Sequence, residues 1–185
     1  MVAGSILPVT IHNNKLLFLF GKENPLETSA KGWSDFGGGL EKNETPFQCA
    51  LREGSEELSG FLGDSQNIKK IIEMNGGVYK LVLNDYHVHI FYLKYDEYLV
   101  KYYNQNHKFL WKSKQIDNQI LKDSCLFEKI EIDWFSVKDI KNGIHEFRSF
   151  YQDIIRLFLS EITNIETFIR KKSQKKRYTL KQNIH

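Results

Sequence analysis

Acidic side chains recur at fixed spacing in the stretch that follows a run of three glycines. The pattern is made of Gly38, Glu44, Arg52, Glu53, Glu56 and Glu57. Mg²⁺ and Mn²⁺ prefer oxygen ligands, which carboxylates supply. Chance would place six fixed residue types in one register only about once in ten million trials. The spacing therefore predicts a divalent-metal site beside a glycine-rich turn.

A helix is expected to carry three of these carboxylates. Thr45 precedes Pro46, and Gln48 follows Thr45 by three positions, which is the pattern of a capping box with proline in the first turn. Apolar residues then recur at spacings of three, four and seven, namely Phe47, Ala50, Leu51 and Leu58. Because Gly60 can adopt a left-handed conformation, we expect a helix over residues 46–58 that stops at Ser59-Gly60.

Glu53, Glu56 and Glu57 would stand at positions i, i+3 and i+4 on one face of this helix. Like charges at this spacing repel, so stability alone would not select them, whereas a bound hard cation would reverse the repulsion. Arg52 can pair with Glu44 or Glu53 and orient it. The alternative is a solvated acidic helix face, but the glycine turn and the arginine in the same register favour the metal site.

The pattern resembles the signature box of the Nudix hydrolase superfamily, whose members cleave a nucleoside diphosphate linked to another group. Here it reads Gly38-x5-Glu44-x7-Arg52-Glu53-x2-Glu56-Glu57. Residues 33–39 resemble the strand that enters the box, and residues 132–137 resemble a late strand that ends in a Trp-aromatic turn. The resemblance covers roughly residues 3–160. It implies an α/β fold in which a mixed sheet lies between helices as an α/β/α sandwich.

The resemblance also implies roles for single residues. The expected Mg²⁺ or Mn²⁺ ligands are Glu53, Glu56 and Glu57, with the carbonyl group of Gly37 as a further oxygen. Arg52 would act in catalysis, and Gly38 and Glu44 would support the site. Two positions depart from the family pattern, because Gly54 replaces an aliphatic residue and Ser59 replaces a glycine. Gly54 should cost roughly 1 kcal/mol in a helix, but neither change removes a metal-binding oxygen.

The general base would be Glu53 or an acidic residue outside the box. Glu128 is the outside candidate, since it stands six residues before Trp134, where several relatives place a late catalytic or metal-binding glutamate. The alternative for Glu128 is an exposed charge at the end of a strand.

Composition indicates one soluble domain that can bury a core, with 185 residues of which 41% are hydrophobic and 14% aromatic. Its two cysteines, Cys49 and Cys125, do not form a disulfide framework, so we expect thiols in a reducing compartment. The chain shows no leader pattern and no apolar run of membrane-spanning length. We therefore expect a cytoplasmic protein, with the nucleus as the other compartment.

The remaining elements follow from periodicity and turn residues. We expect strands over residues 5–11, 16–20, 33–39, 68–74, 78–83, 87–95 and 128–135, and helices over 97–104 and 146–172. Residues 96–127 form a polar, aromatic-rich insertion, irregular after its helix, whose rings either stack a nucleobase or pack internally. The hydrolase domain would span residues 1–169 and be followed by a basic tail, residues 170–185.

The tail holds seven lysines and arginines and no acid, and since the chain carries +3, the remainder carries about −4. Such a tail either binds RNA or another polyanion, or is a solubilising extension.

The leading hypothesis for the function is a Mg²⁺- or Mn²⁺-dependent pyrophosphohydrolase of a nucleoside triphosphate, dinucleoside polyphosphate or nucleotide sugar. The second is an enzyme that acts on the RNA 5′ end, at a cap or triphosphate, and holds RNA by the tail. The third is a non-catalytic Nudix-like binding module, against which the intact glutamates argue.

Overall fold

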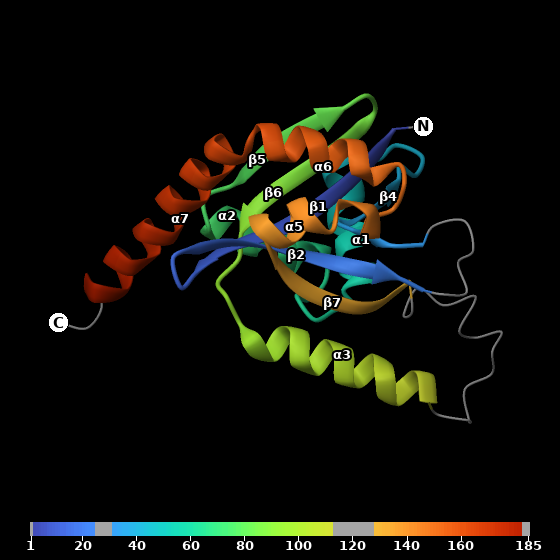
Figure 1. The fold of residues 1–185 in the computed structure, drawn as a ribbon. Coiled ribbons are helices and arrows are strands. Elements are labelled where there is room, and N and C mark those ends of the chain that lie inside the picture. Colours follow the sequence, from blue (N-terminus) through green and yellow to red (C-terminus); the bar gives the residue numbers. More distant parts are fainter. Residues whose placement is uncertain (1, 25–30, 113–127, 183–185) are drawn as a thin grey trace.

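The computed structural model describes residues 2–24, 31–112 and 128–182, and it shows one mixed β-sheet between two layers of helices (Figure 1). The strands are β1 (Ala3–His12), β2 (Lys15–Glu23), β3 (Trp33–Ser34), β4 (Phe36–Gly39), β5 (Val78–Leu83), β6 (Tyr86–Tyr92) and β7 (Lys129–Ser136). The path through the sheet is β3-β2-β1-β6-β5, while β4 pairs with β1 and β7 pairs with β2. The predicted α/β fold with a mixed sheet is confirmed.

The first strand lies at the centre of the sheet. β1 pairs in parallel with β6, where Ala3 stands opposite Tyr86, and it pairs antiparallel with β2. Asn13 and Asn14 turn the chain between β1 and β2 with left-handed φ angles of 48° and 59°. Residues 4–10 are all buried, as expected for a strand that is covered on both faces. The strands predicted over residues 5–11 and 16–20 are confirmed as β1 and β2.

Helices cover both faces of the sheet. They are α1 (Pro46–Glu57), α2 (Ser65–Met74), α3 (Glu97–Lys112), α5 (Val137–Asn142), α6 (Tyr151–Ser160) and α7 (Ile162–Gln182), with a 3₁₀ turn at Ile144–Glu146. α5, α6 and α7 pack on one face, and α1, α2 and α3 pack on the other. Within the described ranges, none of the helices combines the length and the apolarity that crossing a bilayer requires.

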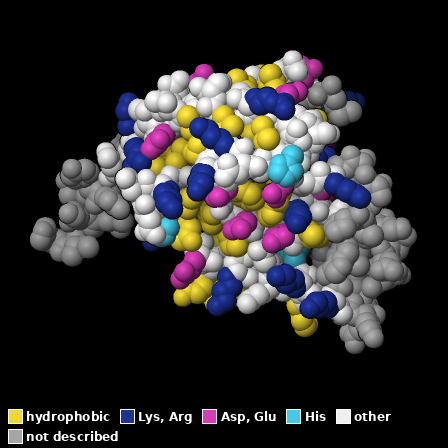
Figure 2. Space-filling model, viewed as in Figure 1, with side chains coloured by type: hydrophobic (Ala, Val, Ile, Leu, Met, Phe, Trp, Pro, Cys, Tyr) yellow, Lys and Arg dark blue, Asp and Glu magenta, His cyan; other side chains and the backbone are white. Residues whose placement is uncertain are grey.

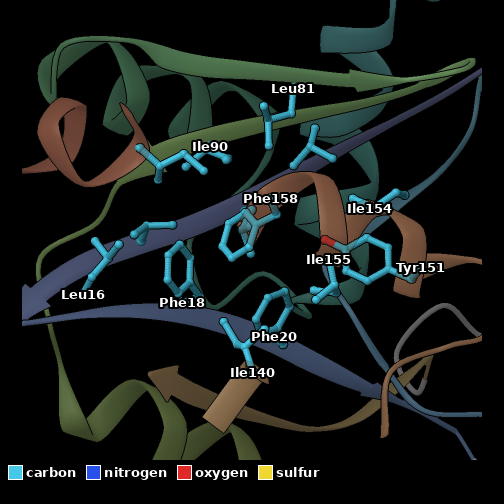
Figure 3. Close-up of a cluster of buried hydrophobic side chains, with 14 of the residues drawn as sticks. Leu16, Phe18, Phe20, Leu81, Ile90, Ile140, Tyr151, Ile154, Ile155 and Phe158 are labelled. Atoms are coloured by element: carbon cyan, nitrogen blue, oxygen red, sulfur yellow. The ribbon is translucent and has the colours of Figure 1, made fainter. Parts of the chain in front are cut away.

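Two hydrophobic clusters attach these layers to the sheet. On the α6 side, the rings of Phe18 and Phe158 meet edge to face with centroids 4.4 Å apart, and Phe20 belongs to the same cluster (Figure 3). On the opposite side, Ala50 of α1 packs in a cluster with Ile132 of β7. This second cluster holds the helix of the predicted carboxylates against the sheet.

Three predicted elements need correction. Residues 68–74 are not a strand but belong to α2, because Asp64 caps the helix through Asn67 N–H at 2.8 Å and Ile68 and Ile72 share its buried face. The helix predicted to end at residue 104 continues to Lys112. The long helix predicted over 146–172 is divided into α6 and α7 around Glu161. Residues 113–127, including Cys125, lie outside the described residues.

The last helix includes most of the predicted basic tail. α7 runs to Gln182, so the backbone of the tail is helical within the described residues. Arg170 is tied to the body of the protein, since its guanidinium donates to the side chain of Asn14 at 3.1 Å and also pairs with Glu166.

Candidate active site

Local sequence signals place the start and end of α1. The side chain of Thr45 accepts a hydrogen bond from Gln48 N–H at 3.3 Å, and Gln48 Oε1 accepts one from Thr45 N–H at 2.9 Å, so the predicted capping box is present. Leu58 caps the other end, and Ser59 and Gly60 then take left-handed φ angles of 50° and 70°. The predicted helix therefore stands, one residue shorter at its end.

The guanidinium group of Arg52 joins three carboxylates. It grips Glu44 in a bidentate manner, with Nε 2.8 Å from Oε1 and Nη2 3.1 Å from Oε2. Its Nη1 lies 2.8 Å from Oε1 of Glu53 and 3.1 Å from Oε2 of Glu56. Nη2 also donates to the carbonyl oxygen of Gly39 at 3.2 Å. Arg52 therefore aligns Glu44 and Glu53 together, whereas the spacing alone left the choice between them open.

The pKa values of Glu44 and Glu53 are shifted in opposite directions. The hydrogen bond from Arg52 holds the pKa of Glu44 below its ordinary value. Burial raises the pKa of Glu53, although Arg52 pulls it in the other direction. The carboxylates, Glu44 first, raise the pKa of Arg52, which stays charged. The site thus holds one permanently charged arginine beside carboxylates whose pKa values differ.

Gly38 lets the Glu53 carboxylate lie directly against the backbone of β4. A Cβ atom at this position would overlap both carboxylate oxygens of Glu53. Any larger residue at position 38 would therefore displace Glu53 from its place beside Arg52. This close approach gives the glycine of the pattern a physical reason.

Glu57 is separated from the other two helix carboxylates. It is 4% exposed, and its Oε1 lies 3.1 Å from Nζ of Lys129, while its Oε2 accepts the Gly37 N–H at 2.8 Å. Lys129 is fully buried at the start of β7, where Nζ also contacts Glu23 and lies 2.8 Å from Oγ of Ser34. Both oxygens of Glu57 are thus engaged by protein groups.

Lys129 is the site residue that the sequence analysis missed. Burial by itself lowers the pKa of Lys129, but the attraction of Glu57 and Glu23 outweighs burial and raises it. The charge of Arg148 completes the network, since its Nη1 lies 2.7 Å from Oε1 of Glu23. A lysine at the start of a strand carries no local signal of burial, so only the pairing of β7 with β2 reveals it.

Glu128, the predicted acid outside the box, lies beside this network. It forms a bend directly before β7, and its carbonyl oxygen accepts the Asn24 N–H at 3.0 Å. Its negative charge contributes to raising the pKa of Glu57, after the larger effect of burial. Glu128 is therefore near enough to Glu57 for its charge to act on that carboxylate, and its catalytic role stays a prediction.

Asp35, two residues before Gly37, is a buried acid. Asp35 is 1% exposed and accepts hydrogen bonds from Ser5 Oγ at 2.5 Å and from the Tyr86 hydroxyl at 2.6 Å. Burial raises its pKa to about 6, against the hydrogen bonds of Ser5 and Tyr86, which lower it. The strand β4, which carries Gly37 and Gly38, therefore follows a residue that is anchored in the core.

The carboxylate oxygens of the site suit a hard cation, although they do not form a complete set of metal ligands. Within the described part of the chain, no group of three His, Cys, Asp or Glu side chains is arranged to hold a metal ion. Glu53 and Glu56 do converge on one positive group, Nη1 of Arg52, so two carboxylates meet around a cation. An all-oxygen donor set of this kind suits Mg²⁺ or Mn²⁺.

Comparison with protein families identifies the domain. The family model of the NUDIX domain matches residues 4–158. The chain therefore belongs to the Nudix family, and it is a pyrophosphohydrolase of that family. The resemblance seen in the sequence is confirmed. A search of curated proteins found no match for the chain.

A search of solved structures found chains that are similar to this one. The bifunctional NMN adenylyltransferase/ADP ribose pyrophosphatase of Francisella tularensis is 18% identical with a TM-score of 0.50, over 86% of this chain and 40% of that one. An Ap4A hydrolase of C. elegans is 13% identical with a TM-score of 0.49, over 88% and 97%. A mutT/nudix family protein of Listeria innocua is 17% identical with a TM-score of 0.46, over 88% and 94%. At these identities the likeness concerns the fold alone.

Proposed function

We propose that the chain is a Mg²⁺- or Mn²⁺-dependent hydrolase that cleaves the pyrophosphate linkage of a nucleoside diphosphate joined to another group. The observation that supports this most is the meeting of Glu53 and Glu56 around one positive group beside Gly38. A solvated acidic helix face would not need a glycine that makes room for a carboxylate. The geometry thus favours a working cation site over the third hypothesis, a binding module.

Glu53 and Glu56 would hold the cation, with the carbonyl group of Gly37 as a further oxygen. When bound, a divalent ion would neutralise charge on the pyrophosphate and activate water for attack at phosphorus. Arg52 would keep both carboxylates oriented through the contacts described above. Glu57, the third expected ligand, would contribute to this site while its Oε1 stays paired with Lys129.

Two residues are candidates for the general base. Burial raises the pKa of Glu53, which makes its carboxylate a stronger base. Glu128 lies on the segment that leads into β7, where its charge acts on Glu57. A comparison of the pH–rate profiles of Glu53→Gln and Glu128→Gln would assign the role, because loss of the base removes the acidic limb of the profile.

The test is a hydrolysis screen with Mg²⁺ and with Mn²⁺ over nucleoside triphosphates, dinucleoside polyphosphates, nucleotide sugars and capped RNA. Ap4A and ADP-ribose, which occur in the names of two of the structures above, belong in it. Glu56→Gln should reduce turnover by at least about 100-fold and weaken Mn²⁺ binding measured by calorimetry. Glu73→Gln, an exposed glutamate on α2, is the matched control and should change neither.

The fold must be the same in both variants, which circular dichroism and thermal melting would check. Wild-type turnover of a small nucleotide, lost in Glu56→Gln alone, would support the proposal. Full turnover and full Mn²⁺ affinity in Glu56→Gln would refute the metal assignment.

A further inference from the structure

The side of α3 that faces away from the sheet carries exposed aromatic rings. Tyr98, Tyr102 and Phe109 expose 50%, 53% and 72% of their surface. Positions i, i+4 and i+11 fall on one narrow stripe of a helix. Leu99 and Tyr103, which lie about 100° further round the helix, are buried in the core. The exposed stripe is therefore not needed to attach α3 to the protein.

Lysines follow the same helix beside the aromatic stripe. Lys101, Lys108 and Lys112 are all exposed, and their spacings of seven and four place them on a second stripe, adjacent to the first. The Nζ of Lys101 lies 5.9 Å from the centre of the Tyr98 ring. Figure 2 shows hydrophobic and basic side chains next to one another along the lower edge of the molecule, where α3 lies in Figure 1. Acidic residues on α3 are confined to Glu97 in its first turn.

We propose that this aromatic–lysine face, formed by Tyr98, Tyr102, Phe109, Lys101, Lys108 and Lys112, binds single-stranded RNA. Aromatic faces stack nucleobases without strong sequence preference, and lysines attract the phosphate backbone. The rings of Tyr98 and Tyr102 lie 5.6 Å apart at an interplanar angle of 19°. Two nearly parallel rings give successive bases similar orientations, which suits a strand that runs along the helix.

The choice of RNA rests on the proposed function. A 5′-triphosphate or a cap on RNA contains the pyrophosphate linkage that the site would cleave. The inner side of α3 also touches the end of the carboxylate helix, since the Tyr103 hydroxyl donates to the Glu57 carbonyl oxygen at 2.7 Å and His107 Nε2 lies 3.3 Å from Ser59 Oγ. A strand on the outer side would lie about one helix diameter, roughly 10 Å, from α1.

Two other occupants fit the face less well. A helix that inserts into a membrane surface presents a continuous apolar face, whereas exposed Gln105 and Asn106 lie between the rings of this one, and its apolar side is already covered by the sheet. A second copy of the chain would bring like-charged lysine stripes together, which is unfavourable.

The test is fluorescence anisotropy of a labelled 12-nucleotide oligo(U) RNA with a 5′-hydroxyl end, mixed with the 185-residue chain without added metal. Because this probe has no cleavable linkage, binding is measured independently of turnover. Tyr98→Ala and Tyr102→Ala should each weaken binding about 5- to 100-fold. Lys101→Gln with Lys108→Gln should reduce the salt dependence, lowering the slope of log affinity against log salt by about one per lost phosphate contact.

Matched controls lie on other surfaces. Phe150→Ala removes an aromatic ring that is 48% exposed, and Lys138→Gln removes an exposed lysine on α5. Both should bind the probe as wild type does. Unchanged binding in the α3 variants would overturn the proposal, and loss of binding only on truncation after Arg170 would assign RNA to α7 instead.

Two further results would overturn it in favour of another occupant. One is binding to anionic phosphatidylserine vesicles, lost in the α3 variants, without RNA binding. The other is a dimer in sedimentation experiments that the same variants dissociate, again without RNA binding. A protein that binds RNA but hydrolyses nothing would refute the proposed function and leave this inference standing. An enzyme that is active on small nucleotides but does not bind RNA would refute this inference and leave the proposed function standing.

Discussion

The ammonium group of Lys129 lies 3.1 Å from Oε1 of Glu57, and both side chains are buried in the protein. Lys129→Met would leave Glu57 and Glu23 buried without the cation they share. Removing one partner of a buried pair typically costs about 3–5 kcal/mol. We expect a loss of that size in the free energy of unfolding, measured by urea denaturation.

The matched control is Lys22→Met on the neighbouring strand. Lys22 pairs with Glu131 at 3.7 Å, but the two side chains are 45% and 41% exposed. An exposed pair of this kind contributes less than about 1 kcal/mol. Equal, small losses in the two variants would show that Lys129 is not the cation on which the buried carboxylates depend.

Arg52→Lys should lower activity while it keeps the positive charge. Lysine cannot reproduce the bidentate contact with Glu44 or reach Glu53 and Glu56 at the same time. Loss of a residue that orients metal ligands typically costs about 10- to 100-fold in activity or metal affinity. Steady-state kinetics and Mn²⁺ titration would measure both quantities. Arg156→Lys, at an exposed pair with Asp153 on α6, is the control, and an Arg52→Lys enzyme as active as this control would contradict the prediction.

Asp35 should make stability fall as pH rises. Its pKa is about 6 in the folded protein against an ordinary 3.8, so between these values the folded state holds a proton that the unfolded state releases. The stabilisation is therefore complete below pH 3.8 and is lost as pH rises through 6. A shift of this size corresponds to on the order of 3 kcal/mol.

Asp35→Asn provides the comparison, since the amide does not titrate. The difference in unfolding free energy between Asp35→Asn and wild type should shift in favour of the variant between pH 4 and pH 7. Urea denaturation at a series of pH values would measure it. A difference that stays constant over this range would mean that Asp35 is ionised in the folded protein throughout.

Gly54→Ala should destabilise the protein although alanine favours helix. A Cβ atom at position 54 would overlap Cδ1 of Ile6, which is fully buried in β1. The gain in helix propensity of roughly 1 kcal/mol is offset by overpacking of about 1–3 kcal/mol. Ile6→Val removes Cδ1, the nearer of the two overlapping atoms, and leaves Cγ1, so the double variant should be more stable than the two separate losses predict, by about 1 kcal/mol. A double-mutant cycle by urea denaturation measures this coupling, and additive losses would argue against the overlap.

Short-range signals in the sequence predicted much of the site. The capping residues Thr45 and Gln48 define the start of α1, and the spacing from Glu44 to Arg52 places their side chains in contact. Both relations depend on residues within one helix and the loop before it. Local propensity and side-chain spacing are sufficient there, because no distant part of the chain is needed to create the contact.

Relations between distant segments could not be predicted in this way. The burial of Lys129 depends on β7 lying beside β2, and the separation of Glu57 from Glu53 depends on that burial. Short apolar runs were also ambiguous: Ile68 and Ile72 fit a helical stripe, but the run was short enough to be taken for a strand. The apolar stripe continues from α6 into α7, so periodicity did not reveal the break at Glu161.

The order of strands in the sheet has a consequence for synthesis of the chain. β1 pairs with β6, which follows more than eighty residues later, and β2 pairs with β7, more than one hundred residues later. The first hairpin therefore leaves the ribosome long before its neighbours exist, with both of its edges open and its apolar faces uncovered. Contacts between such distant segments slow folding and leave strand edges open to aggregation. We infer that the earliest part of this chain is also the part most in need of chaperone protection.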